Sequence, residues 1–181
     1  MTTQTLADPL TAAINAVRTN LARPDADHVA TFAVDTELLD GYDTAVAIRQ
    51  FSLRADEPAS IGGTDRGPTP VELVLAGLGS CQEIVYATYA RILGIPLDAV
   101  TVHAEGRLDM RGFYGVAEVP VGFQDVTYAV EITSSASTED ISRLIAAVDA
   151  HCPVLEILQK PLRVSGDYRL NGKPLAAGGG Q

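Results

Sequence analysis

The stretch GGTDRGPTPVELVLAGLGSC at residues 62–81 decides the fold, because it joins a turn-rich loop to the start of a long helix. Glycine and proline crowd the loop over 55–70, which excludes regular structure there. Thr69 is a suitable N-cap, a proline takes the first helical position, and Glu72 completes a capping box. The sequence therefore predicts a long helix over 70–93.

The first half of this helix is apolar or small on every side, from Leu73 to Cys81. A helix with that composition is usually buried all round. Its small residues, Gly77, Gly79 and Ser80, would let another backbone approach closely. We therefore expect this helix to lie at the centre of the fold.

Before the loop, the pattern predicts a short amphipathic helix and then β-structure. Asp8 is a suitable N-cap for a helix that ends before Pro24. Two β segments follow, over roughly 28–38 and 44–54. The apolar phase of the second segment switches near Arg49, which indicates either a bulge or two short strands.

After the long helix, alternating apolar residues predict a strand over 99–109 and, beyond a connection at 111–122, a second strand that includes residues 126–133. Ser137 or Thr138 then caps a helix that Pro153 interrupts, and a shorter helix and a last strand beginning at 162–164 follow. Together these elements predict an α+β fold with antiparallel sheet. We divide the chain into an N-terminal helical extension (1–27), one domain (28–172) and a flexible C-terminal tail (173–181).

Composition excludes several classes of protein. The 181 residues are 46% hydrophobic and 20% charged, as in a globular protein. The formal net charge of −10 argues against a nucleic-acid partner, and no apolar run is long enough for a membrane helix. The first residues lack the pattern of a secretory signal. We therefore expect a cytoplasmic protein without a nucleic-acid or membrane partner.

The chain has only two cysteines, Cys81 and Cys152. Cys81 lies within the long helix, where a cysteine is often only a small buried hydrophobe. Cys152 directly precedes Pro153, so it takes an N-cap position where backbone N–H groups favour a thiolate. If the fold brings the two together, they can alternate between dithiol and disulfide. That chemistry calls for a cation near the first sulfur and needs no cofactor or metal.

Three stretches resemble the OsmC/Ohr family of osmotically inducible and organic hydroperoxide resistance proteins. They are FSLRADEP at 51–58, GGTDRGPTPVELVLAGLGSC at 62–81, and HCPVLEIL at 151–158. Their order and spacing match the family, and the resemblance covers the chain from about residue 28 to residue 170. It implies an intertwined homodimer in which antiparallel sheets wrap around long central helices, with active sites between the subunits.

The resemblance also implies thiol-dependent reduction of organic or lipid-like hydroperoxides. Cys81 would be the peroxidatic thiol and Cys152 the resolving thiol, with Arg54 stabilising the thiolate. A dithiol of the lipoamide or thioredoxin type would then reduce the disulfide. One position departs from the family: Val71 stands where well-characterised members have a glutamate that binds the arginine. Glu72 follows one residue later and serves as a possible supporting residue.

The sequence also offers other candidate site residues and an alternative function. Two other arginines, Arg49 and Arg66, are alternatives to Arg54 as the cation near the first sulfur. Arg49 shares a strand phase with apolar neighbours, and Arg66 lies in the loop. His151 adjoins Cys152 but is expected to be an exposed or capping residue, and the histidines lack metal-ligand spacing. The Val71 departure favours an alternative function, a non-catalytic or weakly active dimeric protein that binds a small ligand in the stress response.

Overall fold

The computed structural model describes residues 8–175. The elements in chain order are α1 (Pro9–Leu21), β1 (Asp35–Asp40), β2 (Asp43–Ile48), β3 (Phe51–Ala55), a 3-10 turn (Ala59–Ile61), α2 (Pro70–Leu93), β4 (Ala99–Leu108), α3 (Met110–Phe113), β5 (Phe123–Thr133), α4 (Thr138–His151), α5 (Pro153–Gln159), β6 (Tyr168–Leu170) and β7 (Lys173–Leu175). All strand pairs are antiparallel, which confirms the predicted α+β class.

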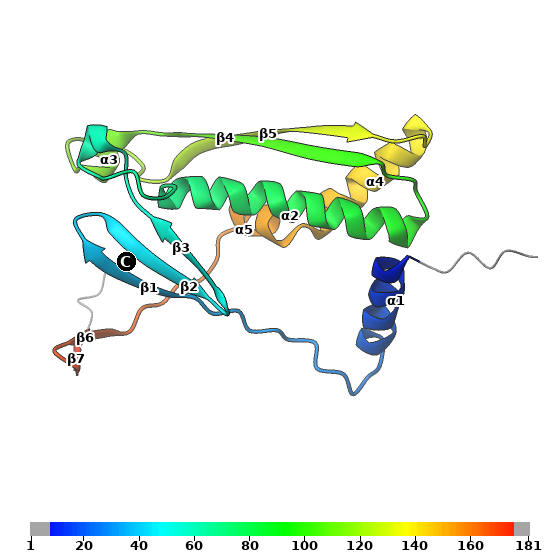
Figure 1. Cartoon of the computed structure of the whole chain (residues 1–181), viewed down its shortest axis with the longest axis horizontal. Coiled ribbons are helices and arrows are strands. Elements are labelled where there is room, and N and C mark those ends of the chain that lie inside the picture. The colour runs from blue at the N-terminus through cyan, green and yellow to red at the C-terminus, as the bar shows by residue number, and fades with distance from the viewer. Residues whose placement is uncertain (1–7, 176–181) are drawn as a thin grey trace, which may run out of the picture.

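The long helix α2 is the central element, and its predicted bounds are confirmed. The Thr69 side chain accepts a hydrogen bond from Glu72 N, and the Glu72 carboxylate accepts one from Thr69 N. At the other end Gly94 has a left-handed φ of 67°, which terminates the helix. In Figure 1 the β4–β5 pair covers one side of α2, and α4 and α5 lie behind it.

Strands β1, β2 and β3 form a separate antiparallel sheet beside the start of α2 (Figure 1). The predicted phase switch near Arg49 is a tight turn between two strands, not a bulge. Arg49 takes a positive φ of 55° in that turn, so it does not share a strand phase with Phe51. The first predicted strand is shorter than expected, because residues 28–34 form no regular structure.

The core lies between α2, α4 and the inner face of β4–β5. Leu78, Val85 and Tyr86 of α2 are buried against Leu144 and Val148 of α4. Helical spacing places each of these sets on one face of its helix.

The other side of α2 is open in the single chain, so the prediction that its first half is buried all round is wrong here. Val74 is 40% exposed and Ile84 is 67% exposed. Among the described residues, β4, α4, α5 and, near its end, α1 pack against α2, and they leave these two side chains exposed.

The ends of the described chain differ in part from expectation. Helix α1 packs near the end of α2, where Arg91 Nε donates to Asp8 Oδ2 at 2.6 Å. The last strand does not begin at 162–164, because that segment has no strand to pair with. Tyr168–Leu170 instead pairs with Lys173–Leu175 across a tight turn. Within the described residues, no helix combines the length and apolarity that crossing a membrane requires.

Candidate functional site

The fold brings the two cysteines together. Cys81 lies on α2, and Cys152 is the residue that ends α4 and begins α5. The Cys152 thiol donates to the Cys81 sulfur at a distance of 3.4 Å between the two sulfur atoms. Cys152 is 2% exposed, whereas Cys81 is only partly buried. A disulfide has a sulfur–sulfur distance of about 2.05 Å, so an oxidant that removes two electrons and both thiol protons could join them after a short approach.

The surroundings of Cys81 within one chain hold it as a thiol. Burial raises the pKa of the Cys81 thiol, and the Cys152 thiol raises it further. The backbone N–H of Val154, in the first turn of α5, acts in the opposite direction. None of the described Lys or Arg side chains contributes to this pKa. Among residues 8–175 of one chain, no cation therefore acts on Cys81 as a peroxidatic thiolate would require.

Arg54 binds an acidic residue rather than Cys81. Its Nε donates to Asp43 Oδ1 at 2.7 Å, and its Nη2 donates to the other oxygen. Arg66 Nη1 also donates to Asp43 Oδ2, at 3.0 Å. Arg54 and, to a smaller extent, Arg66 lower the pKa of the nearly buried Asp43. Two guanidinium groups share one carboxylate, which leaves this cluster with a surplus positive charge.

The loop that carries Arg66 is ordered by a buried carboxylate, Asp56. It accepts hydrogen bonds from the Thr64 hydroxyl at 2.7 Å and from the backbone N–H groups of Glu57, Thr64 and Arg66. The Thr64 hydroxyl is the largest cause that lowers the pKa of Asp56 to about 2, against an opposing effect of burial.

Two residues in the first turn of α2 do not contact the thiols. Glu72 makes the capping box with Thr69, and the Val71 side chain is 40% exposed.

A small polar cluster lies behind the thiols. The Tyr128 hydroxyl of β5 donates to Asp149 Oδ1 of α4 at 3.3 Å. Burial, the Asp149 carboxylate and Tyr128 raise the pKa of Tyr86 to about 12. Gln82, the residue after Cys81, is fully buried in the same region.

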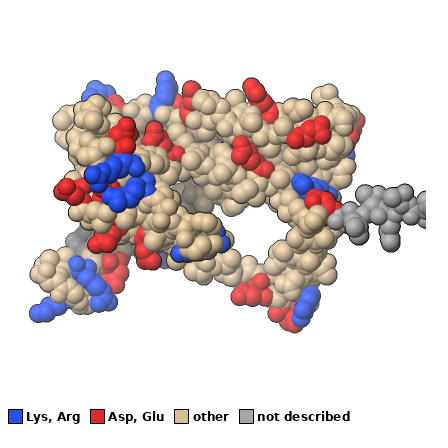
Figure 2. Space-filling model, in the orientation of Figure 1, with Lys and Arg blue, Asp and Glu red and all other residues tan. Residues whose placement is uncertain are grey.

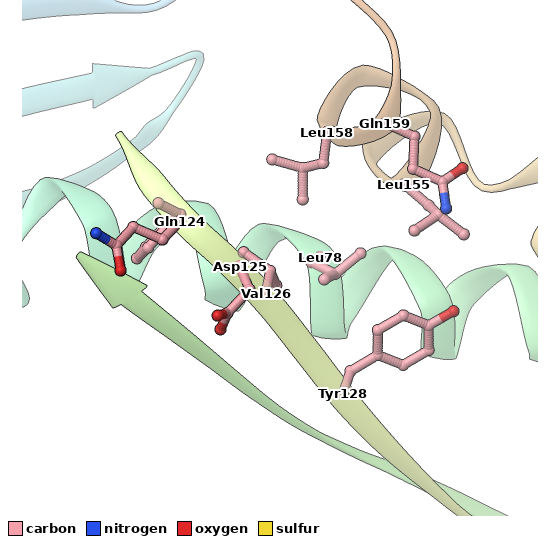
Figure 3. Close-up of a pocket in the computed structure, with 9 residues that line it drawn as sticks. Leu78, Gln124, Asp125, Val126, Tyr128, Leu155, Leu158 and Gln159 are labelled. Carbon is pink, nitrogen blue, oxygen red and sulfur yellow. The ribbon is translucent and has the colours of Figure 1, made fainter. Parts of the chain in front are cut away.

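A pocket of about 410 Å³ borders this cluster. In Figure 3 the labelled side chains around it come from α2 (Leu78), from β5 (Val126 and Tyr128) and from α5 (Leu155 and Leu158). Cys81 does not line it. Cys152 does not line it either, and the pocket lies between β5 and α5, beside Leu78 of α2.

The remaining candidates lie outside this arrangement. His151 is exposed, its Nδ1 is 2.7 Å from Ala147 O, and its ring stacks on Tyr89. The Arg49 guanidinium lies 5.3 Å from the centre of the Phe51 ring. Among residues 8–175, no group of three or more side chains could hold a metal ion. Figure 2 shows acidic and basic side chains interspersed over one face of the molecule, without a broad basic surface.

Sequence reasoning missed three residues of this site: Asp43, Gln82 and Tyr128. Asp43 meets Arg54 only through the pairing of β2 with β3, which sequence spacing does not reveal. Gln82 gave a signal that could have been used. It lies four residues after Leu78 and four before Tyr86, in the middle of the buried stripe of α2.

A family model described as OsmC-like protein matches residues 63–165. An OsmC like protein from Mycoplasma pneumoniae superposes with a TM-score of 0.62 at 21% identity, covering 72% of this chain and 88% of that one. An organic hydroperoxide resistance protein OsmC from Legionella pneumophila gives 0.56 at 22% identity, covering 72% and 92%.

A third solved structure has the same fold. It is an organic hydroperoxide resistance protein from Elizabethkingia anophelis with thiocyanate bound, with a TM-score of 0.53 at 18% identity, covering 70% of this chain and 88% of that one. No curated protein matches the sequence. At these identities the solved structures support a shared fold.

Proposed function

The chain belongs to the OsmC-like protein family, and from that premise we propose that it is a thiol-dependent peroxidase that reduces organic hydroperoxides. The observation that carries the proposal is the 3.4 Å distance between the sulfurs of Cys81 and Cys152. Structural neighbours named organic hydroperoxide resistance proteins support the choice of substrate. Apolar residues pack around Cys81, which suits an organic or lipid-like hydroperoxide.

The proposed reaction has two steps at sulfur before reduction. The Cys81 thiolate attacks the terminal oxygen of the hydroperoxide, the O–O bond breaks, and the alkoxide leaves and takes a proton to become an alcohol. Cys81 is then a sulfenic acid. The Cys152 thiol attacks that sulfur, the S–O bond breaks, and water leaves as the disulfide forms. A dithiol of the lipoamide or thioredoxin type returns both cysteines to thiols.

The proposal includes a homodimer, because the site of one chain is incomplete. Cys81 has no cation among the described residues, and Arg54 binds Asp43 within its own chain. Exposed apolar side chains, among them Ile84 at 67% and Phe51 at 55%, leave surface for a second copy to cover. In the dimer, Arg54 of one subunit would approach Cys81 of the other and lower the pKa of its thiol.

Peroxide consumption tests the function directly. With dihydrolipoamide as reductant, the purified protein is expected to consume cumene hydroperoxide, and Cys81→Ser is expected to abolish that consumption. A Cys81→Ser variant as active as the wild type would overturn the proposal. Mass spectrometry after one equivalent of peroxide is expected to find a Cys81–Cys152 linkage, and its absence would remove the resolving role of Cys152.

Two further measurements test Arg54 and the assembly. Sedimentation is expected to give twice the chain mass of 19.1 kDa. Arg54→Met is expected to raise the pKa of Cys81 alkylation and to slow peroxide consumption, whereas the turn variant Arg49→Met is the matched control. A monomer in solution, or equal rates for the two variants, would contradict the role given to Arg54.

The raised pKa of Cys81 favours a second candidate function, a non-catalytic or weakly active dimeric protein that binds a small ligand in the stress response. A cysteine held as a thiol reacts slowly with peroxide. Oxidation of Cys81 at the rate of free cysteine, without turnover by several reductants, would support this candidate over the peroxidase. The proposed place of action is the cytoplasm, where dithiol reductants keep cysteines reduced.

A further inference from the structure

The Gln82 side chain is the buried polar group that the peroxidase mechanism leaves unused. Its residue is 0% exposed, and neither Nε2 nor Oε1 has a hydrogen-bond partner among the described residues. A buried polar group without a partner destabilises a fold relative to an apolar group of similar shape. Native proteins hold few such groups, and a functional role is one reason for keeping one.

Gln82 occupies the layer between helices that also holds Cys152. Leu78 lies one turn before it and Tyr86 one turn after it, and both are buried. Val148 and Cys152 lie one turn apart on the facing surface of α4 and its C-terminal end, and they belong to the same core cluster. The amide and the buried thiol therefore enter one layer from opposite helices.

The Tyr128 hydroxyl marks how close the two groups are. Burial is the main cause that raises the pKa of Tyr128, followed by the Asp149 carboxylate. The Cys152 thiol also raises it, and the Gln82 amide lowers it. Both groups therefore lie near the same hydroxyl. That hydroxyl donates its proton to Asp149 and interacts with the nearby Gln82 side chain, but no described atom meets hydrogen-bond geometry with Gln82 Nε2 or Oε1.

We propose that the Gln82 amide N–H donates a hydrogen bond to the Cys152 sulfur when that sulfur is a thiolate, and so stabilises it as the leaving group when the disulfide is reduced. The inference rests on the proposed function. A thiolate of the reductant attacks the more exposed Cys81 sulfur, the S–S bond breaks, and the electron pair stays on Cys152. The second thiol of the reductant then displaces Cys81 and closes a cyclic disulfide.

The surroundings explain why this thiolate needs a neutral donor. The titratable groups that face Cys152 are Cys81 and Tyr86 from α2, Tyr128 from β5, and Asp149 from its own helix, with His151 next to it in the chain. The first four carry no positive charge in any protonation state, and His151 is occupied with Ala147 O and Tyr89. Cys152 is the N-cap of α5, but its sulfur accepts no capping hydrogen bond from the backbone N–H groups of that helix. A thiolate without a hydrogen-bond donor at a 2% exposed site is strongly disfavoured.

Gln82→Met tests the inference, because methionine keeps the length of the side chain and removes both polar atoms. The disulfide is formed with diamide, so that no peroxidase activity is needed, and its reduction by dihydrolipoamide is followed by alkylation and mass spectrometry. We expect reduction to slow about tenfold or more, while the urea midpoint of unfolding rises because an unpaired polar group has left the core. The matched control is Gln50→Met, at an exposed turn, which changes neither quantity.

A titration separates a thiolate-stabilising role from a structural one. In a Cys81→Ser background, absorbance at 240 nm follows Cys152 alone, and Gln82→Met is expected to raise the pKa of that thiol by about one unit. An unchanged reduction rate, an unchanged Cys152 pKa or a lower urea midpoint would each overturn the inference. If diamide forms the disulfide but hydroperoxide does not, the peroxidase proposal fails and this test still stands. If diamide forms no Cys81–Cys152 disulfide, both fail.

Discussion

Gly67→Ala is expected to displace the loop that carries Arg66, because there is no room for a side chain at this position. A Cβ atom on Gly67 would lie 2.1 Å from the carbonyl oxygen of Arg54, whereas ordinary contacts begin at 3.4 Å. The two backbone segments would therefore have to separate by about 1.3 Å, the difference between these distances. Neither the Arg54 carbonyl nor the loop can yield by a side-chain rotation, since both are backbone.

The expected loss in the free energy of unfolding follows from the contacts that this movement breaks. Separation removes the hydrogen bond from Asp56 N to Pro68 O, which is 3.3 Å long and contributes about 1 kcal/mol. Overpacking adds about 1–3 kcal/mol. We therefore expect the free energy of unfolding to fall by roughly 2–4 kcal/mol. Arg66 also moves away from Asp43, so the arginine cluster beside the loop is disturbed.

Urea denaturation of Gly67→Ala beside Gly122→Ala measures the effect. A Cβ on Gly122 would have no atom within 4 Å, and we expect that variant to stay within about 0.5 kcal/mol of the wild type. Equal stability of the two variants would refute the reasoning about the loop. If Arg54 takes part in peroxide reduction, Gly67→Ala also lowers that rate more than Gly122→Ala does.

Three further predictions concern the core, the central helix and the dependence on pH. Leu144→Ala empties a fully buried site between α4 and α2. In urea denaturation we expect the free energy of unfolding to fall by about 2–5 kcal/mol. A loss below about 1 kcal/mol would contradict the place of Leu144 in the core. Thr69→Ala removes the N-cap of α2 and is expected to lower the free energy of unfolding by about 1 kcal/mol, with exposed Thr19→Ala on α1 as the control. The pKa of Asp56 is lowered to about 2, so its stabilisation is present above about pH 4 and lost as pH falls toward 2. The difference in Tm between the wild type and Asp56→Asn is therefore expected to shrink over that range, and a difference independent of pH would argue against this anchor.

Sequence reasoning succeeded where the determining interactions are local. The capping box of α2 involves residues three apart, so its start was predictable. The pair of helices around Cys152 was predictable because Pro153 fixes the break. The last strand was misplaced because a strand needs a partner. An apolar alternation at 162–164 does not reveal that only residues 168–170 find one across the turn at Asn171.

The candidate site also combines features that local sequence predicts with features that depend on tertiary packing. The two cysteines could be nominated from their local contexts, but their 3.4 Å separation depends on α4 packing against α2. The partner of Arg54 could not be foreseen, since Asp43 reaches it across a strand pair. The burial of Gln82 could have been predicted from its helical spacing to Leu78 and Tyr86, but its lack of a hydrogen-bond partner depends on which elements pack over that face of α2.

The position of Cys152 at the joint of two helices has a consequence for chain topology. A bond to Cys81 would enclose everything from the middle of α2 to the start of α5 in one covalent ring, including the whole β4–β5 pair. For a ring of this size, the lost freedom of the unfolded chain amounts to about 4 kcal/mol. The oxidised protein would then unfold at a distinctly higher temperature than the reduced one. The unfolding temperature would therefore show whether a molecule carries the disulfide or two free thiols.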